Sequence, residues 1–265
     1  MVLHFGDWGI ADIFLMKCLY EMRRAMALQP LTYQVGDLSF SGYLADGSGG
    51  RTVPGILVAH EGGGFLTDHP TERAQMIADL GYVAFALDLF GDPRPTLEVA
   101  KQIVRQLRSD APLLRSRVQA ALALLRQQPN VDPGRIAAVG FCFGGTAVLE
   151  LARSGAEIAC TVGFHAGLTT SALDDARLIR GKVLVCQGND DPIVTAEQRD
   201  RFAAEMTRAA VDWQMHLYGG VGHSFTNRHI DAWNIPGFAY HAGADRRSWR
   251  AMRDLLNEVF RATGA

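Results

Sequence analysis

Residues 140–145 read Gly-Phe-Cys-Phe-Gly-Gly, between an apolar run typical of a buried strand and a segment typical of a helix. This is the setting of the G-x-S-x-G turn of α/β enzymes, here with cysteine in the serine position. The turn holds its central residue in a strained conformation, and side chains two residues away would collide with the neighbouring strand and helix. Gly140 and Gly144 remove those side chains. The stretch therefore predicts that Cys142 stands at the carboxyl end of a strand and at the start of a helix.

Strand-like and helix-like segments alternate on both sides of this turn. The expected strands are an antiparallel edge pair within residues 31–45, then 54–60, 82–87, 135–140, 158–164, 182–187 and 211–218. The expected helices include 71–80, 97–107 and 113–126, with others after Cys142 and at the end of the chain, and one from Thr195, which has the form of a capping box with Gln198. This alternation predicts an α/β fold with a mostly parallel central sheet and helices on both faces. Active sites on such sheets form at the carboxyl ends of the strands.

The composition is that of an ordinary globular protein, with 265 residues, 48% hydrophobic and 20% charged residues, and a formal net charge of −2. We expect residues 29–265 to form a single domain, preceded by an N-terminal extension over residues 1–28. No basic patch or run of basic residues indicates nucleic acid or a membrane as a partner. We expect a small-molecule partner and a monomer or homodimer.

The four cysteines, Cys18, Cys142, Cys160 and Cys186, form no C-x-x-C pair and no metal-ligand spacing. A disulfide framework is therefore not expected, which fits a reducing cytoplasm. Cys160 and Cys186 lie in apolar, strand-like runs typical of buried thiols. Cys142 differs, because the dipole of the helix that follows it favours an anion and hence the reactive thiolate.

Two further segments follow predicted strands and carry groups that could assist this thiol. His223 lies in a glycine-rich loop after the last strand, where it could take the thiol proton and later protonate a leaving alkoxide. Asp191 lies after the preceding strand, where a carboxylate could orient the His223 ring. Spacing leaves Asp190 as an alternative, and both aspartates could merely shape a turn before Pro192. The order nucleophile, acid, histidine is that of α/β enzymes with this turn.

Residues 60–64, His-Glu-Gly-Gly-Gly, follow another predicted strand. Their glycines would let backbone N–H groups turn toward a developing oxyanion, with the N–H of Phe143 as the second donor. Removing one such donor commonly lowers the rate about a hundredfold or more. Glu61 is unusual in this loop, because a carboxylate repels a thiolate unless it is protonated or bonded elsewhere. We therefore expect Glu61 to regulate the thiol.

Together these segments resemble the dienelactone hydrolase family. The resemblance rests on G-F-C-F-G-G at 140–145, H-E-G-G-G at 60–64, G-N-D-D-P-I-V at 188–194 and G-H-S-F at 222–225, and it extends over residues 31–260. It implies an α/β-hydrolase fold that cleaves carboxylic esters or lactones through a covalent acyl-enzyme, without a cofactor or metal. Carried onto this chain, it implies Cys142 as the nucleophile, Asp191 as the acid and His223 as the base. It also implies an oxyanion hole made by the N–H groups of Gly62 and Phe143.

The resemblance also implies a role for Glu61, and this chain departs from the family's pattern at two positions. In the well-studied bacterial members, the matching glutamate holds the resting cysteine and helps to release it as a thiolate when substrate binds. Those members bind the substrate carboxylate with two arginines, but this chain has Asn227 in one position and Asp92 near the other, with Arg94 close by. The sequence therefore leaves open whether dienelactone itself is a substrate, since Arg94 could compensate for Asp92. Residues 236–240 could cover the site and shape its pocket.

The same residues leave two other functions open. An amidase or peptidase on this fold would need stronger protonation of the leaving group and better positioning. A thiol sensor or binding protein would keep the scaffold and a reactive Cys142 without turning over any substrate. Matched esters and amides, tested on the protein and on Cys142→Ala, separate these functions.

Overall fold

The computed structural model describes residues 28–92 and 94–261, so that the predicted N-terminal extension lies outside the described residues except for Leu28. The strands are β1 (Leu28–Val35), β2 (Leu38–Asp46), β3 (Val53–Ala59), β4 (Val83–Leu87), β5 (Val131–Phe141), β6 (Cys160–Phe164), β7 (Lys182–Gly188) and β8 (Trp213–Tyr218). The α-helices are α2 (His69–Ala78), α3 (Leu97–Ser109), α4 (Ala111–Arg126), α5 (Phe143–Arg153), α6 (Ala196–Arg208) and α7 (Ala242–Phe260), with 3-10 helices η1 (Leu173–Leu178) and η2 (Ile230–Trp233). Within this part of the chain, no helix has the length and apolar character needed to cross a membrane.

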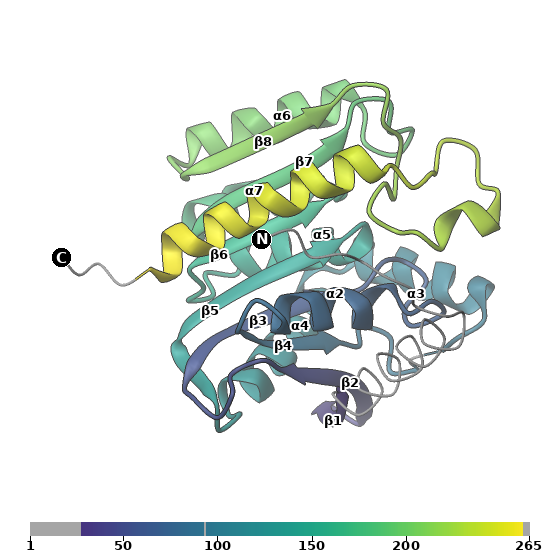
Figure 1. Ribbon diagram of the computed structural model, residues 1–265. Coiled ribbons are helices and arrows are strands. Elements are labelled where there is room, and N and C mark those ends of the chain that lie inside the picture. The colour runs from purple at the N-terminus through teal and green to yellow at the C-terminus, as the bar shows by residue number, and fades with distance from the viewer. Residues whose placement is uncertain (1–27, 93, 262–265) are drawn as a thin grey trace, which may run out of the picture.

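The strands form one eight-stranded sheet in the order β1-β2-β4-β3-β5-β6-β7-β8. β2 pairs antiparallel with both β1 and β4, whereas each pair from β4–β3 to β7–β8 is parallel. Figure 1 shows this twisted sheet with α7 and α2 on the near face and α4 and α5 behind it. The predicted α/β fold, with a mostly parallel sheet and an antiparallel edge, is confirmed. Because β3 and β5 are neighbours, the loops that follow them meet at one edge of the sheet.

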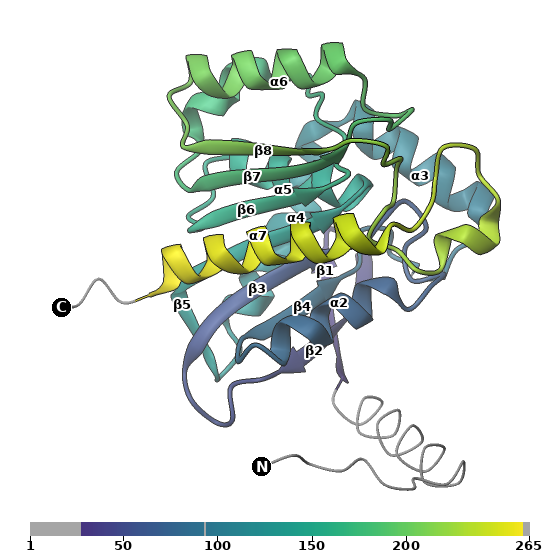
Figure 2. The same cartoon turned by 45° about the horizontal axis from the view of Figure 1, so that its top comes forward.

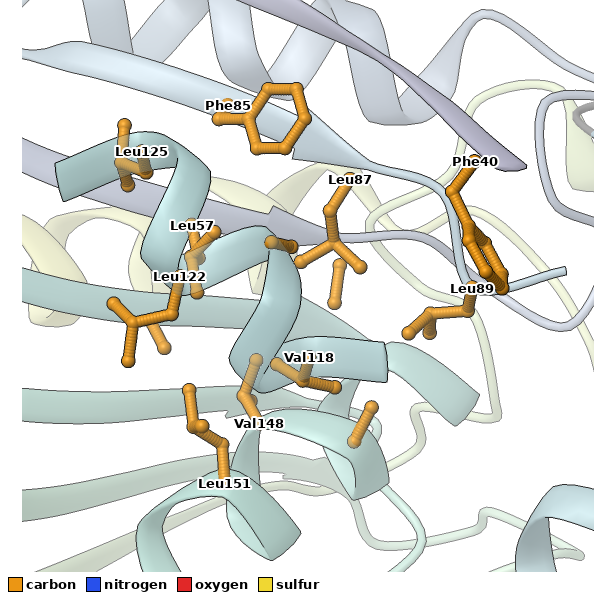
Figure 3. Packing of buried hydrophobic residues seen from close by; sticks show 14 of the residues in the cluster. Phe40, Leu57, Phe85, Leu87, Leu89, Val118, Leu122, Leu125, Val148 and Leu151 are labelled. Atoms are coloured by element: carbon orange, nitrogen blue, oxygen red, sulfur yellow. The ribbon is translucent and has the colours of Figure 1, made fainter. Parts of the chain in front are cut away.

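Alternate side chains of the central strands belong to two different cores. Leu57 and Ala59 of β3 pack with α4 and α5, whereas Ile56 and Val58 pack with α2 and α7. Figure 3 shows the first of these clusters, in which Leu57 lies among leucine and valine side chains of α4 and α5. A strand covered on both faces needs apolar residues at every position, which explains the continuous apolar runs in the sequence.

The ends of the elements differ from the predicted ones by a few residues. α2 begins at His69, two residues before the predicted start, because Pro70 fits the first turn of a helix. β5 begins at Val131, where it pairs with Val53 of β3. The predicted capping box at Thr195 is confirmed, since its hydroxyl accepts from the N–H of Gln198 and its own N–H donates to the side chain of that residue.

Candidate active site

The turn at Cys142 has the strained geometry that the sequence predicts. Cys142 joins β5 to α5 with φ 52° and ψ −114°, which is uncommon for a residue other than glycine. A Cβ atom on Gly140 would lie 2.1 Å from the carbonyl oxygen of Gly144, and one on Gly144 would lie 2.2 Å from that of Ala59. The backbone N–H of Cys142 donates to the carbonyl of Phe164 at 2.9 Å, which ties the turn to β6. Close backbone packing therefore requires both glycines.

His223 and Asp191 form a buried pair near this turn. Nδ1 of His223 lies 2.6 Å from Oδ2 of Asp191. The other carboxylate oxygen, Oδ1, accepts from the N–H groups of Ile193 at 2.7 Å and Val194 at 3.1 Å. These contacts fix the orientation of the carboxylate, which in turn holds a proton on Nδ1 of the ring. Nε2 of His223 is then the nitrogen that can gain or lose a proton during a reaction.

Residues 237–239 form backbone hydrogen bonds with His223 and pack against its ring. The N–H of His223 donates to the carbonyl of Gly237 at 2.8 Å, and the N–H of Ala239 donates to the carbonyl of His223 at 3.2 Å. The ring of Phe238 packs against the imidazole with a centroid distance of 4.6 Å. Residues predicted to cover the site thus contact the histidine directly.

The protonation of His223 depends on its two charged neighbours. Burial disfavours the imidazolium, but Cys142 and Asp191 outweigh this effect and raise the pKa of His223 to about 10. Nε2 is buried and has no hydrogen-bond partner of normal geometry among the described residues, and Cys142 lies close enough to influence the pKa of the ring. Because folding raises the pKa of His223, protonation of this ring stabilises the folded protein. The stabilisation is complete at pH values below about 6.5, the ordinary pKa of histidine, and is lost as the pH rises toward about 10.

The described cysteines should differ sharply in reactivity. Cys160 and Cys186 are buried, and burial raises the pKa of each thiol to about 12, whereas Cys142 is partly exposed and lies beside His223. We expect iodoacetamide at pH 7 to alkylate Cys142 about 100-fold faster than either buried thiol, because the thiolate is the reactive form. Peptide mass spectrometry over time gives the rate at each site. Equal rates at Cys142 and Cys160 would contradict an activated thiol.

The structure brings Asp191, and not Asp190, against His223. Asp190 is exposed, and its carboxylate accepts from the side chain of Asn189 at 3.1 Å. Two histidines that follow His223 in the chain have different surroundings. His229 pairs with Glu72, and His241 caps α7 by accepting from the N–H of Ala244 at 3.0 Å.

The loop that carries Glu61 is held against the end of β4. Nε2 of His60 accepts from the N–H of Leu89 at 3.0 Å, so its Nδ1 carries the proton and donates to the carbonyl of Glu61 at 2.7 Å. The same carbonyl accepts from the N–H of Gly64 at 3.1 Å. These bonds form a tight turn at Gly62, next to the start of α5, where the N–H of Phe143 has no partner inside its own helix.

A cavity of about 290 Å³ opens beside Cys142. Figure 2 shows the loop between β8 and α7, drawn in yellow-green, extending toward α3, and these two segments supply much of the cavity wall. The wall is largely apolar and includes Val104, Ile230, Trp233, Ile235 and Phe238. In the residues that the structure describes, no cluster of three or more His, Cys, Asp or Glu side chains could hold a metal ion.

The charged residues of this cavity differ from those considered in the sequence. Asp92 and Arg94 do not line it, although the N–H of Arg94 donates to the carboxylate of Asp92 at 3.0 Å. Lys101 and Arg105 of α3 do line it, as does Asn227. Sequence reasoning missed the two cations because nothing local shows that α3 faces the loop after β8.

A second group of missed residues lies beneath the cavity. Nδ1 of His165 accepts from the N–H of Cys142 at 3.1 Å, and its Nε2 lies 2.8 Å from the hydroxyl of Thr226. That hydroxyl is 3.3 Å from Nε2 of His69, which also accepts from Nε of Arg73 at 3.3 Å. In the sequence, the one feature that could have indicated this group was the position of His165 directly after a predicted buried strand.

Fold and site together define a hydrolase of the α/β-hydrolase type, with a strained strand–helix turn at Cys142 after the central strand β5 and a buried histidine–aspartate pair beside it. The sequence model of the dienelactone hydrolase family matches residues 40–260, and the chain belongs to that family.

Solved structures and curated proteins include clear relatives. A structure named m3DLH is 45% identical, with a TM-score of 0.84 over 88% of this chain and 98% of the other. A dienelactone hydrolase-like promiscuous phosphotriesterase from metagenomic libraries is 41% identical, with a TM-score of 0.83 over the same shares. A carboxymethylenebutenolidase of a Pseudomonas species is 28% identical over 65% of this chain and 74% of its own length.

Proposed function

We propose that this chain hydrolyses carboxylic esters or lactones by a covalent mechanism, with Cys142 as nucleophile, His223 as acid and base, and Asp191 as the group that orients the histidine. The observation that carries this proposal is the 2.6 Å contact between His223 and Asp191 beside a cysteine at a strained strand–helix turn. The raised pKa of His223, about 10, supports a protonated His223 beside Cys142 at neutral pH.

In the first half of the reaction the Cys142 thiolate attacks the carbonyl carbon and forms a C–S bond. The carbonyl electron pair moves onto oxygen, and the N–H groups of Gly62 and Phe143 stabilise this oxyanion. When the carbonyl re-forms, the C–O bond to the alcohol breaks. The imidazolium of His223 gives the alkoxide its proton from Nε2, and an acyl-enzyme remains.

In the second half, water attacks the thioester carbonyl. Neutral His223 takes a proton from this water through Nε2, while Asp191 stabilises the imidazolium that forms. Collapse of the second tetrahedral intermediate breaks the C–S bond. The acid leaves, and thiolate and imidazolium are restored.

A p-nitrophenyl acetate assay tests this proposal. Wild type should show a burst of nitrophenol followed by steady turnover, and intact-mass spectrometry of the quenched burst should find one acetyl group on Cys142. Acetylation of another residue, or turnover without any acyl-enzyme even after rapid quenching, would contradict the covalent route.

We expect neutral esters to be better substrates than carboxylate-bearing lactones. The inner wall of the cavity presents the neutral amide of Asn227 to a substrate carboxylate, and the two cations of the wall, Lys101 and Arg105, lie on the exposed face of α3, where water screens them. A hydrogen bond to a charged group contributes about 1.5–3 kcal/mol, so its absence should lower kcat/KM for the carboxylate substrate about 10- to 100-fold. A lactone with a free carboxylate, compared with its methyl ester, measures this preference. Faster cleavage of the free acid would contradict it.

Neutral phosphotriesters are a second candidate substrate class. The 41% identical relative is described as a promiscuous phosphotriesterase, and the largely apolar cavity here suits a neutral triester. The thiolate of Cys142 would attack phosphorus, form a P–S bond and displace an aryloxide, and water would then cleave the P–S bond to give a dialkyl phosphate and restore the cysteine. Diethyl p-nitrophenyl phosphate tests this activity. Nitrophenol release no faster than with Cys142→Ala would exclude it.

A further inference from the structure

The two carboxyl oxygens of Glu61 have different surroundings. Oε2 accepts from the side-chain amide of Asn227 at 2.5 Å. Oε1 is buried and has no hydrogen-bond partner among the described residues, and the nearest ring nitrogen, Nε2 of His165, is 3.8 Å away. Glu61 lines the same cavity as Cys142. An ionised carboxylate would therefore leave one charged oxygen buried without a partner, which is costly.

The orientation of Asn227 is fixed by its own contacts. Its side-chain oxygen accepts from the N–H of His229 at 2.9 Å, and its backbone N–H donates to the carbonyl of Ser224 at 2.9 Å. The side chain is almost fully buried. Its NH₂ group must then face Glu61, because the oxygen is already engaged. The side chains that donate to Glu61, Asn227 and Ser224, are thus neutral and not cationic.

The imidazole rings near Glu61 supply no positive charge. His165 accepts from the N–H of Cys142 through Nδ1, so its single proton is on Nε2 and points to the hydroxyl of Thr226. Burial and the neighbouring cationic groups lower the pKa of His165 well below its ordinary value. His69 also stays neutral, since burial and Arg73 lower its pKa in the same way.

Two cationic groups act on Glu61 from packed elements. One is His223, and the other is Arg73 of α2, whose guanidinium is already paired with Asp245 at 2.9 Å. Burial of the carboxyl raises the pKa of Glu61 above its usual value and outweighs the lowering by these two groups and by the side-chain hydrogen bonds.

The remaining charged side chains of the cavity act weakly on Glu61. Lys101 and Arg105 of α3 are exposed, and Lys101 already pairs with Glu98 at 2.7 Å, so their effect is screened by water.

We propose that Asn227 holds Glu61 as a neutral carboxylic acid in the resting protein, with the proton on Oε1. Oε2 is the carbonyl oxygen of this acid, because it accepts from the amide of Asn227. A neutral Glu61 does not repel an anion that forms at Cys142 during the reaction, and only this consequence rests on the proposed function.

Infrared difference spectroscopy tests the protonation without any turnover. The spectrum of wild type minus Glu61→Gln at pH 7 should contain the carbonyl stretch of one protonated carboxylic acid. Glu98→Gln, at an exposed and paired glutamate, is the matched control and should show only carboxylate bands. Carboxylate bands alone in the Glu61→Gln difference would overturn the proposal, whether or not the chain proves to be an esterase.

Asn227→Leu tests the positioning role with a side chain of similar size. Loss of the amide donor should shift the Glu61 carbonyl band to higher frequency, because a carbonyl that accepts no hydrogen bond is stiffer. Circular dichroism and thermal unfolding show whether the variant is folded. A band at the wild-type position in the folded variant would remove Asn227 from the proposal, and if the variant does not fold, the shift is measured in Asn227→Ala.

Discussion

Replacement of Cys142 by alanine should abolish hydrolysis of p-nitrophenyl esters while the protein stays folded. The C–S bond cannot form without the sulfur, and the oxyanion donors and cavity alone provide only residual catalysis. We expect kcat/KM to fall at least about 10⁴-fold, as for the loss of other covalent nucleophiles. Steady-state kinetics at saturating and limiting ester concentration, with circular dichroism on the same sample, measures this loss.

Cys160→Ala is the matched control for that experiment. Cys160 is fully buried at the start of β6, the opposite end of the strand from the turn at Cys142. Activity within about twofold of wild type is expected, because substitutions at distant sites act independently. Full activity in Cys142→Ala would exclude the covalent mechanism.

Asp191→Asn should also cause a large loss of activity, by changing the protonation of His223. The asparagine oxygen can still accept from the N–H groups of Ile193 and Val194, so its NH₂ group would face Nδ1 of the ring. Nδ1 must then accept, and the proton moves to Nε2, where the neutral ring can no longer act as a base. A loss of about 10³- to 10⁴-fold in kcat is expected from this change of tautomer.

Asp190→Asn provides the comparison for that variant, since it makes the same chemical change one residue earlier. Asp190 is exposed and contacts Asn189 and not the histidine. Its substitution should leave kcat within about twofold of wild type, as for other exposed positions without buried partners. Equal losses in the two variants would mean that the loop, and not the carboxylate at Asp191, is what catalysis requires.

Local sequence signals predicted much of the fold. Glycines two residues on either side of Cys142 predicted the tight turn, and the structure shows that a Cβ at either position would meet backbone atoms. The capping box at Thr195 was likewise predicted from residues three apart. Such signals succeed because the atoms that decide them are neighbours in the chain, so that local sterics and hydrogen bonding suffice.

Contacts between distant segments could not be predicted in this way. Spacing did not distinguish Asp191 from Asp190, since the choice depends on which carboxylate the folded loop turns toward His223, 32 residues later. The bond between Glu61 and Asn227 spans 166 residues, and nothing near either residue indicates it.

The chain's local patterns thus determined the sheet, the helices and the strained turn that presents a cysteine, because short-range sterics and apolar periodicity encode them. Tertiary packing alone decided the cavity beside that cysteine, from the meeting of α3 with the loop after β8, and the neutral amide that faces Glu61. The physical reason is that burial, which raises the pKa of Glu61, and the neighbouring groups that raise the pKa of His223 are properties of the assembled structure and not of any one segment.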